Sequence, residues 1–154
     1  MIRDRQWIAA RIPHSGTMCL LDRVLEGDAE CIVCAANSHR APDNPLRTRD
    51  GLSAVHAIEY AAQAMALHRS FATDDPPGAS SGQPPRGMLT SVRNVVCHVD
   101  RLDDIDGDLV IAATRVSGER ELVIYAFAVR AGERLLVSGR ATALLDVSTL
   151  AQAR

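Results

Sequence analysis

The chain has 154 residues, which fits one domain with a substantial hydrophobic core and is too short for two independent domains. Hydrophobic residues make up 47% of the sequence but aromatic residues only 3%, so the core must consist mainly of Ala, Val, Leu and Ile, and base stacking on exposed rings is disfavoured. A formal net charge of -2 at pH 7 argues against binding to nucleic acid or to an anionic membrane surface.

The sequence contains no lysine, which excludes Schiff-base chemistry through a lysine amine. No apolar segment reaches the roughly 18 residues that span a bilayer, and Met1 is followed by charged residues rather than by the apolar core of a signal peptide. These features predict a cytoplasmic protein without a membrane segment.

The first 36 residues predict one short helix and two strands. Trp7, Ile8 and Ile12 recur at helical spacing after an Asp, which predicts a short amphipathic helix over Asp4–Ile12. Strands are expected over Met18–Leu25 and Glu30–Ala36, joined through Glu26-Gly27-Asp28.

Cys31 and Cys34 form a CxxC pattern inside the second predicted strand. Residues three apart on a strand point to opposite faces, so these two cysteines are a poor pair for a metal or a disulfide. We expect buried, reduced thiols.

The Ala-rich segment from Gly51 to His68 predicts a long buried helix, with bounds of about Leu52–Phe71. At about 100° per residue, His56, Glu59 and Gln63 fall on one side of it, and the opposite side is apolar. Polar side chains on so apolar a helix suggest a chemical function. The start of this helix is expected to supply free backbone N–H groups.

The predicted loops flank this helix, and the remaining strands follow it. Arg40–Asp50 and Thr73–Gly87 are rich in turn residues, and the second could be a mobile surface loop or a lid beside a site. Four strands are expected after them, the last three forming an antiparallel meander: Met88–Val99, Leu109–Val116, Leu122–Arg130 and Leu135–Leu145. A single helix among antiparallel strands can bury its apolar side by lying across one curved sheet, which is an α+β architecture.

Two motifs carry a resemblance to a known family. The stretch Ile12-Pro-His-Ser-Gly-Thr-Met-Cys-Leu-Leu-Asp-Arg-Val24 resembles the N-terminal signature of the bacterial β-hydroxyacyl-acyl-carrier-protein dehydratases, and Ile58-Glu-Tyr-Ala-Ala-Gln-Ala64 is similar to their helix motif. Asn44-Pro-Leu, His56-x-x-Glu59 and Ser91-Val-Arg93 look more like a divergent branch of that family, associated with aryl-polyene gene clusters.

The resemblance implies the hot-dog fold, in which an antiparallel sheet wraps a long helix and two protomers join their sheets. It also implies sites at the dimer interface and an acyl chain carried on the phosphopantetheine thioester of an acyl carrier protein, with no resident cofactor. The implied partners are that carrier protein and a second copy, a higher oligomer or a related dehydratase subunit.

One departure from the family concerns its catalytic base. The resemblance places a loop histidine about fourteen residues before the helix glutamate, but Pro42-Asp43-Asn44-Pro45-Leu46 stands there instead. His56 is the expected replacement base, although it could instead pair with Glu59 and only support a subunit interface. Glu59 matches the family's acid, which an apolar setting would keep neutral. Asn44, Gly51, Leu52 and Gln63 are expected at the substrate, with free N–H groups near Gly51 receiving the thioester oxygen and Gln63 orienting Glu59 or a water.

The other histidines have weaker cases. His14 matches a position in the Pro-His turn that looks structural, His39 could substitute for the missing base, and His68 and His98 have no recognisable partner pattern. None has the spacing of metal ligands, so no metal site is expected. Four arginines could form a basic rim for the carrier protein or simply be solvated: Arg47, Arg49, Arg86 and Arg93.

Three functions remain open at this point. The leading hypothesis is a 3-hydroxyacyl-acyl-carrier-protein dehydratase in fatty-acid or aryl-polyene biosynthesis. A non-catalytic dehydratase-like subunit that binds the carrier protein or supports an active partner is the first alternative. The second is an acyl thioesterase that uses Glu59 and a water.

Overall fold

The computed structural model describes residues 2–72, 87–119 and 122–144. All but Gly87 of the predicted loop Thr73–Gly87, and Leu145 at the end of the last predicted strand, therefore lie outside the described residues. The helices are α1 (Arg5–Ala9) and α2 (Ala57–Ala72), with short 3₁₀ turns at Gly16–Met18, Ser38–Arg40 and Ala54–His56. The strands are β1 (Arg23–Gly27), β2 (Cys31–Ala36), β3 (Met88–Cys97), β4 (Leu109–Glu119), β5 (Leu122–Ala131) and β6 (Arg134–Leu144).

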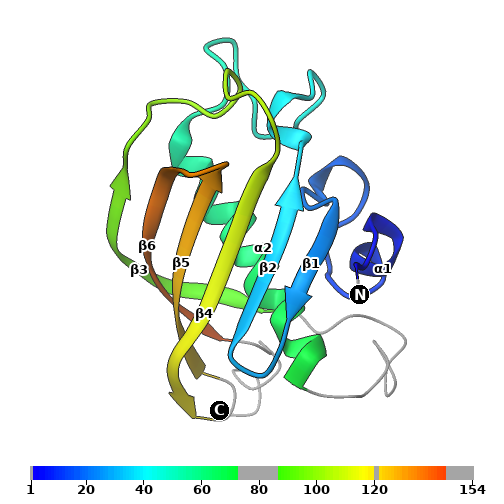
Figure 1. Ribbon diagram of the computed structural model, residues 1–154, viewed down its shortest axis with the longest axis vertical. Coiled ribbons are helices and arrows are strands. Elements are labelled where there is room, and N and C mark those ends of the chain that lie inside the picture. Colours follow the sequence, from blue (N-terminus) through cyan, green and yellow to red (C-terminus); the bar gives the residue numbers. More distant parts are fainter. Residues whose placement is uncertain (1, 73–86, 120–121, 145–154) are drawn as a thin grey trace, which may run out of the picture.

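The six strands form one antiparallel sheet in the order β1-β2-β4-β5-β6-β3 (Figure 1). The predicted meander is present, because β4 pairs with β5 and β5 with β6. β3 returns to pair with the outer side of β6 and forms one edge, while β1 forms the other.

Residues 31 and 34 lie on opposite faces of β2, with the Cys34 side chain fully buried and Cys31 half-buried, both as free thiols.

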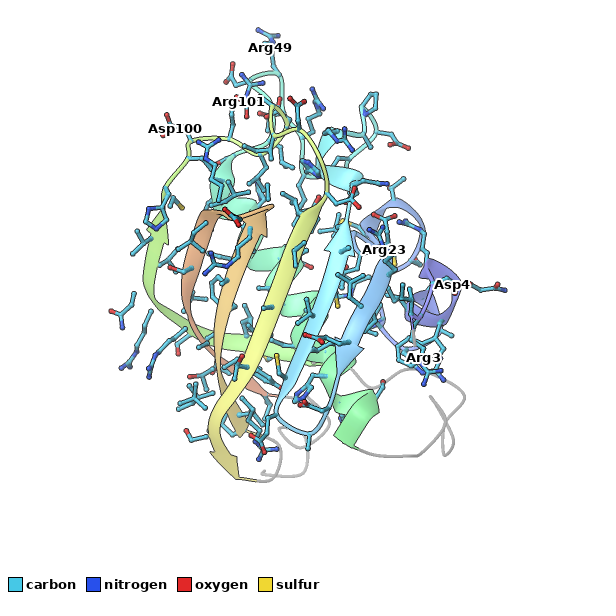
Figure 2. All side chains as sticks on the ribbon, viewed as in Figure 1. Arg3, Asp4, Arg23, Arg49, Asp100 and Arg101 are labelled. Atoms are coloured by element: carbon cyan, nitrogen blue, oxygen red, sulfur yellow. The ribbon has the colours of Figure 1, made fainter. Side chains whose placement is uncertain are left out.

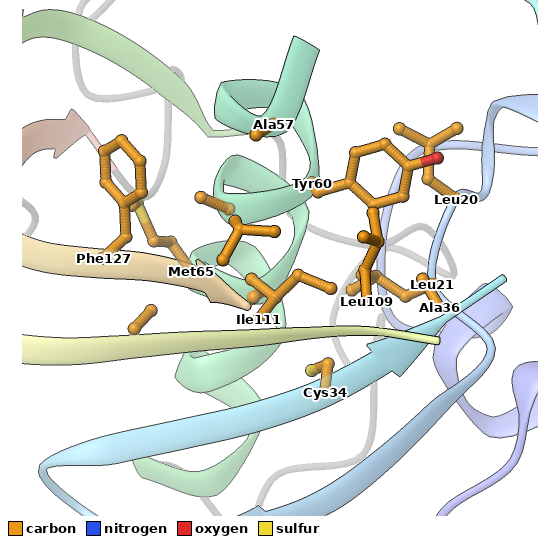
Figure 3. Packing of buried hydrophobic residues seen from close by; sticks show 14 of the residues in the cluster. Leu20, Leu21, Cys34, Ala36, Ala57, Tyr60, Met65, Leu109, Ile111 and Phe127 are labelled. Carbon is orange, nitrogen blue, oxygen red and sulfur yellow. The ribbon is translucent and has the colours of Figure 1, made fainter. Parts of the chain in front are cut away.

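Helix α2 lies across one face of the curved sheet and contacts β2, β4 and β5 (Figure 1). Its core side carries small residues, including Ala57, Ala61 and Ala64, which allow the helix to approach the strands closely. Larger side chains fill the layer between them, among them Tyr60, Leu109 and Phe127 (Figure 3). The predicted α+β architecture, a long helix wrapped by an antiparallel sheet, is confirmed.

The long helix begins later than its sequence pattern predicted. Leu52 and Ser53 are not helical, because they run alongside residues 100–103: Ser53 forms a bridge to Arg101, and the Leu52 carbonyl accepts a hydrogen bond from the Leu102 N–H at 2.8 Å. Gly51 has φ 105°, in the region that favours glycine, and an added Cβ would lie 2.7 Å from the Asp103 carboxylate. The chain therefore enters α2 through a constrained turn rather than through a helical one.

The first strand is shorter than predicted. Met18–Leu25 was expected to be extended, but the described strand β1 begins at Arg23. The preceding segment bonds to a side chain of α2: the Leu20 N–H donates to Gln63 Oε1 and the Met18 carbonyl accepts from Gln63 Nε2. The apolar run Cys19-Leu20-Leu21 is buried, but the sequence pattern could not identify the hydrogen-bond partner of this segment.

Two histidines are buried in the fold away from the polar side of α2. His68 contacts the Tyr125 hydroxyl through Nδ1 at 2.7 Å and the Asp28 carbonyl through Nε2 at 2.8 Å. His39 is fully buried, with Nε2 3.0 Å from the Ile105 carbonyl. Burial lowers the pKa of both imidazoles below their usual value, against smaller opposing effects of those carbonyls.

These two histidines predict a loss of stability on mild acidification. Their lowered pKa values mean that the unfolded chain binds protons first as the pH falls below about 6.5, so the free energy of unfolding should decrease between about pH 7 and pH 5. Urea denaturation across this range measures the decrease. His68→Gln should make the decrease shallower, whereas His98→Gln, at an exposed position, should leave it unchanged. An equal decrease in the free energy of unfolding in the original protein and in both variants would contradict the contribution assigned to His68.

No helix within the described residues is long and apolar enough to cross a membrane.

Candidate functional site

A pocket of about 220 Å³ opens beside the polar side of α2. Three segments distant in sequence form it: the turn after α1, one face of α2, and the paired ends of β3 and β6. The wall is mostly apolar and carries three ionisable side chains. The lining residues are Pro13, His14, Glu59, Ala62, Met65, Ala66, Arg69, Gly87, Met88, Leu89, Ala143 and Leu144.

His14 and Glu59 are in direct contact in this pocket. His14 Nε2 lies 3.1 Å from Glu59 Oε1, and the two side chains are 27% and 34% exposed, so the pair is partly desolvated but open to a substrate. The other ring nitrogen of His14, Nδ1, is buried and has no hydrogen-bond partner in the described part of the chain. An imidazole beside a carboxylate in an apolar pocket can move protons to and from a bound molecule.

Gln63 connects the two segments that carry this pair. Its side chain is fully buried and uses both ends of the amide: Oε1 accepts from the Leu20 N–H at 2.9 Å, and Nε2 donates to the Met18 carbonyl at 2.7 Å. Nε2 is also 3.3 Å from Glu59 Oε1. One amide thus holds the segment following His14 against α2 and contacts the carboxylate as well.

The Glu59 carboxyl group differs from the neutral acid expected from its apolar setting. Burial raises its pKa, but hydrogen bonds from His14 and Gln63, together with the charges of His14 and His56, outweigh that effect and leave the pKa below its usual value. Glu59 is therefore a carboxylate near neutral pH. This ionisation suits a proton acceptor better than the proton donor that the sequence suggested.

His56 shares no hydrogen bond with Glu59. It ends the 3₁₀ turn Ala54–His56 and is half-buried, and the described residues include no hydrogen-bond partner for its ring. Only a small electrostatic effect on the Glu59 pKa connects the two side chains. A 3₁₀ turn has 3.0 residues per turn rather than 3.6, so α-helical angles counted from Gly51 do not apply to His56.

The backbone N–H groups at the start of the helix are not free, contrary to expectation. The Gly51 N–H donates to the Thr48 carbonyl at 3.0 Å, and the Leu52 N–H donates to Asp103 Oδ1 at 2.9 Å. The Asp103 carboxylate is almost fully buried and also pairs with Arg101 and, at 3.6 Å, with Arg47. Gly51 and Leu52 are buried outside the pocket lining, so these amides do not present a place for a thioester oxygen.

Asn44, another expected substrate contact, is committed to the fold. Asn44 is 6% exposed. Its Nδ2 donates to the Ser38 carbonyl and the Tyr60 hydroxyl, and its Oδ1 accepts from the Leu46 N–H. Asn44 thereby ties the loop that lacks the family histidine to α2. The structure brings Gln63 into contact with Glu59, but of the expected set only Glu59 lines the pocket. Gln63, Asn44, Gly51, Leu52 and His56 lie outside the pocket lining.

His14 was not expected beside Glu59, because its position in the Pro-His turn looked structural. The available signal was Gln63: a buried amide one turn after Glu59 indicates that another segment packs against the polar side of the helix. His39, the other replacement considered, does not line the pocket.

None of the arginines considered for a basic rim lines the pocket within the described residues. Arg47 and Arg49 belong to the loop before α2, and Arg93 is exposed in the middle of β3. Arg86 lies outside the described residues. Figure 2 places Arg49 among the loops at one end of the molecule, far from Arg3. Across the ranges that the structure describes, no group of three or more His, Cys, Asp or Glu side chains could hold a metal ion.

Comparison with solved structures gives several similar folds. The dehydratase heterocomplex ApeI:P from Xenorhabdus doucetiae contains a chain that is 22% identical, with a TM-score of 0.79 and 95% of each chain covered. Zebra fish thioesterase superfamily member 2 is 16% identical, with a TM-score of 0.59 and coverage of 90% of this chain and 92% of its own. At these identities the likeness establishes the hot-dog fold alone.

A search of the curated proteins found no match. The family model described as ApeP dehydratase matches residues 6–152, which include His14, Glu59, Gln63 and every strand. The resemblance in the sequence, the wrapped helix and this match agree with one another. The chain therefore belongs to the ApeP-like family of dehydratases.

Proposed function

We propose that this protein removes water from a 3-hydroxyacyl thioester carried by an acyl carrier protein, in an assembly pathway of the aryl-polyene or fatty-acid type. The observation that supports this most is the contact between His14 and Glu59 in an apolar pocket. Elimination of water needs a base for the α-proton and an acid for the leaving hydroxyl group. A carboxylate and an imidazole in contact can supply both.

In the proposed reaction the Glu59 carboxylate accepts the proton from the α-carbon. The electron pair of that C–H bond forms the double bond to the β-carbon, the β-carbon–oxygen bond breaks, and protonated His14 gives its Nε2 proton to the departing hydroxyl, which leaves as water. The new proton on Glu59 then passes to His14 Nε2 across the 3.1 Å contact, which restores both groups. No other reactant is required.

The remaining pocket wall suits an acyl chain. Ala62, Ala66 and Arg69 follow Glu59 along one side of α2 and all line the pocket. At about 1.5 Å of rise per residue, this row extends the pocket along the helix by about 15 Å from Glu59 to Arg69. Small alanine side chains leave room for the chain, and Met65 and Leu89 add apolar surface.

The hydrogen bonding at the start of α2 favours a second role for this protein, as one subunit of a dehydratase built from two different chains. The N–H groups of Gly51 and Leu52 are already used within the chain, so the donors for the thioester oxygen must be supplied elsewhere. β3 is an edge strand with exposed Met88 and Val96, and its outer edge suits pairing with another sheet. We propose that a second copy or a related dehydratase subunit adds to this edge.

The test is incubation of the purified protein with 3-hydroxyacyl carrier protein, alone and together with a related dehydratase subunit. Mass spectrometry follows loss of water and release of free acid in the same sample. Enoyl product from the protein alone supports the leading proposal, and enoyl product only from the mixture supports the subunit role. Free acid without enoyl product would identify a thioesterase and overturn both.

A further inference from the structure

Two arginines near the start of the chain stack on one tryptophan. The guanidinium carbon of Arg11 lies 3.9 Å from the centre of the Trp7 ring, and that of Arg3 lies 5.0 Å from it. Arg11 Nη1 also donates to the Trp7 carbonyl at 3.1 Å, which fixes its position. Contacts between cations and an aromatic face are favourable, so Trp7 brings two like charges together.

These two cations lack a carboxylate partner within the described ranges. The nearby acids are used elsewhere: Asp4 caps α1 by accepting from the Trp7 N–H, and Asp22 pairs with Arg5 at 3.4 Å. Burial lowers the pKa of the Arg11 guanidinium, and the charge of Arg3 adds to this effect, in agreement with their close approach. A pair of uncompensated guanidinium groups attracts an anionic partner.

The pair adjoins the pocket through the chain itself. Arg11 precedes the pocket residues Pro13 and His14, and Arg5 Nη2 donates to the Gly16 carbonyl at 3.0 Å in the same turn. Arg3 pairs through its backbone with Val24 of β1, whereas the sheet edge proposed for a second subunit is β3, at the other end of the strand order. Figure 2 shows Arg3 beside α1, away from the loops that carry Arg49.

We infer that Arg3 and Arg11, held on Trp7, form a docking surface for the acidic face of the acyl carrier protein. This inference rests on the proposed function, which requires such a carrier. A carrier docked here has its prosthetic arm beside the turn that carries His14, so the thioester enters the pocket next to the His14–Glu59 pair. The two guanidinium groups recognise carboxylates of the partner. Nucleic acid is disfavoured as the anionic partner, because this chain has a net charge of -2.

The test compares two double variants with the same change in charge. Arg3→Glu/Arg11→Glu reverses the docking pair, and Arg130→Glu/Arg134→Glu reverses two exposed arginines at the ends of β5 and β6. Calorimetry measures the binding of 3-hydroxyacyl carrier protein at low and moderate salt. The docking variant should weaken binding by about tenfold or more and lose most of the salt dependence, while the control stays within about twofold of the original protein.

A soluble N-acetylcysteamine thioester separates docking from chemistry, because it carries no protein. The docking variant should dehydrate it at the original rate. If neither the protein alone nor its mixture with a related dehydratase subunit dehydrates either substrate, the proposed function fails, but the binding comparison still decides the docking surface. Unchanged carrier binding in the docking variant, or equal weakening in the control, would overturn the inference. Arg3→Glu alone, which keeps the Arg11 contacts, serves if thermal unfolding shows the double variant to be unstable.

Discussion

Glu59→Gln is expected to lower the rate of dehydration by a factor of about 10³, because general acid–base groups contribute about 10²–10⁴ to such reactions. The amide keeps the shape of the side chain and its position beside His14, but it cannot accept the α-proton. Steady-state kinetics with 3-hydroxyacyl carrier protein measure the loss, which should appear in kcat with little change in KM. Thermal unfolding of the variant checks that the fold is intact.

His14→Gln should cause a comparable loss, while His56→Gln should retain most of the activity. The contrast follows from geometry: His14 Nε2 contacts Glu59 at 3.1 Å and lines the pocket, whereas His56 ends the preceding 3₁₀ turn outside the pocket lining. His56→Gln is therefore the matched control, since it removes an imidazole near the same carboxylate. A reversed result, with His56 required and His14 dispensable, would restore the assignment suggested by the sequence and refute the pair proposed from the structure.

Gln63→Leu is expected to reduce the free energy of unfolding by about 2–4 kcal/mol. Leucine fills much of the same volume, but it leaves the buried Leu20 N–H and the Met18 carbonyl without partners, and each unsatisfied group costs about 1–3 kcal/mol. Chemical denaturation measures the change. Gln6→Leu, at an exposed position on α1, is the control and should stay within about 0.5 kcal/mol of the original stability.

The same substitution should move the pH dependence of the reaction. The Gln63 amide is one of the groups that lower the Glu59 pKa, so its removal raises that pKa and shifts the acidic limb of the rate profile to higher pH. A purely structural role for Gln63 predicts lower stability with an unmoved acidic limb. The two measurements therefore distinguish a residue that positions the carboxylate from one that only supports the fold.

The sheet could be predicted from sequence because alternating burial follows directly from strand geometry. β5 shows this plainly, with buried Val123, Tyr125, Phe127 and Val129 separated by more exposed residues. The candidate site could be predicted only in part. Glu59 and Gln63 lie on one regular helix, whose periodicity fixes their relation, but His14 reaches them from another segment. Contacts across such sequence separations depend on packing that local periodicity does not encode.

The ionisation of Glu59 illustrates the same limit. An apolar helix correctly indicated a partly desolvated carboxyl group, and desolvation alone would raise its pKa. The deciding hydrogen bonds come from His14 and Gln63, and only the first of these requires the folded arrangement of two separate segments. A sequence pattern predicts whether a group has apolar surroundings more readily than it predicts which residues form hydrogen bonds with that group.

The strand order also divides the sheet into parts that must assemble differently. β4, β5 and β6 follow one another as adjacent hairpins, so their pairing closes only short loops. β2 pairs with β4, although α2 and β3 lie between these two strands in the sequence. Closing this longer loop costs more conformational entropy, which favours late pairing of β2 during folding. The turn that carries His14, helix α2 and the end of β3 all line the pocket and all precede β4 in the chain, so the pocket depends on their packing against the hairpin trio β4, β5 and β6.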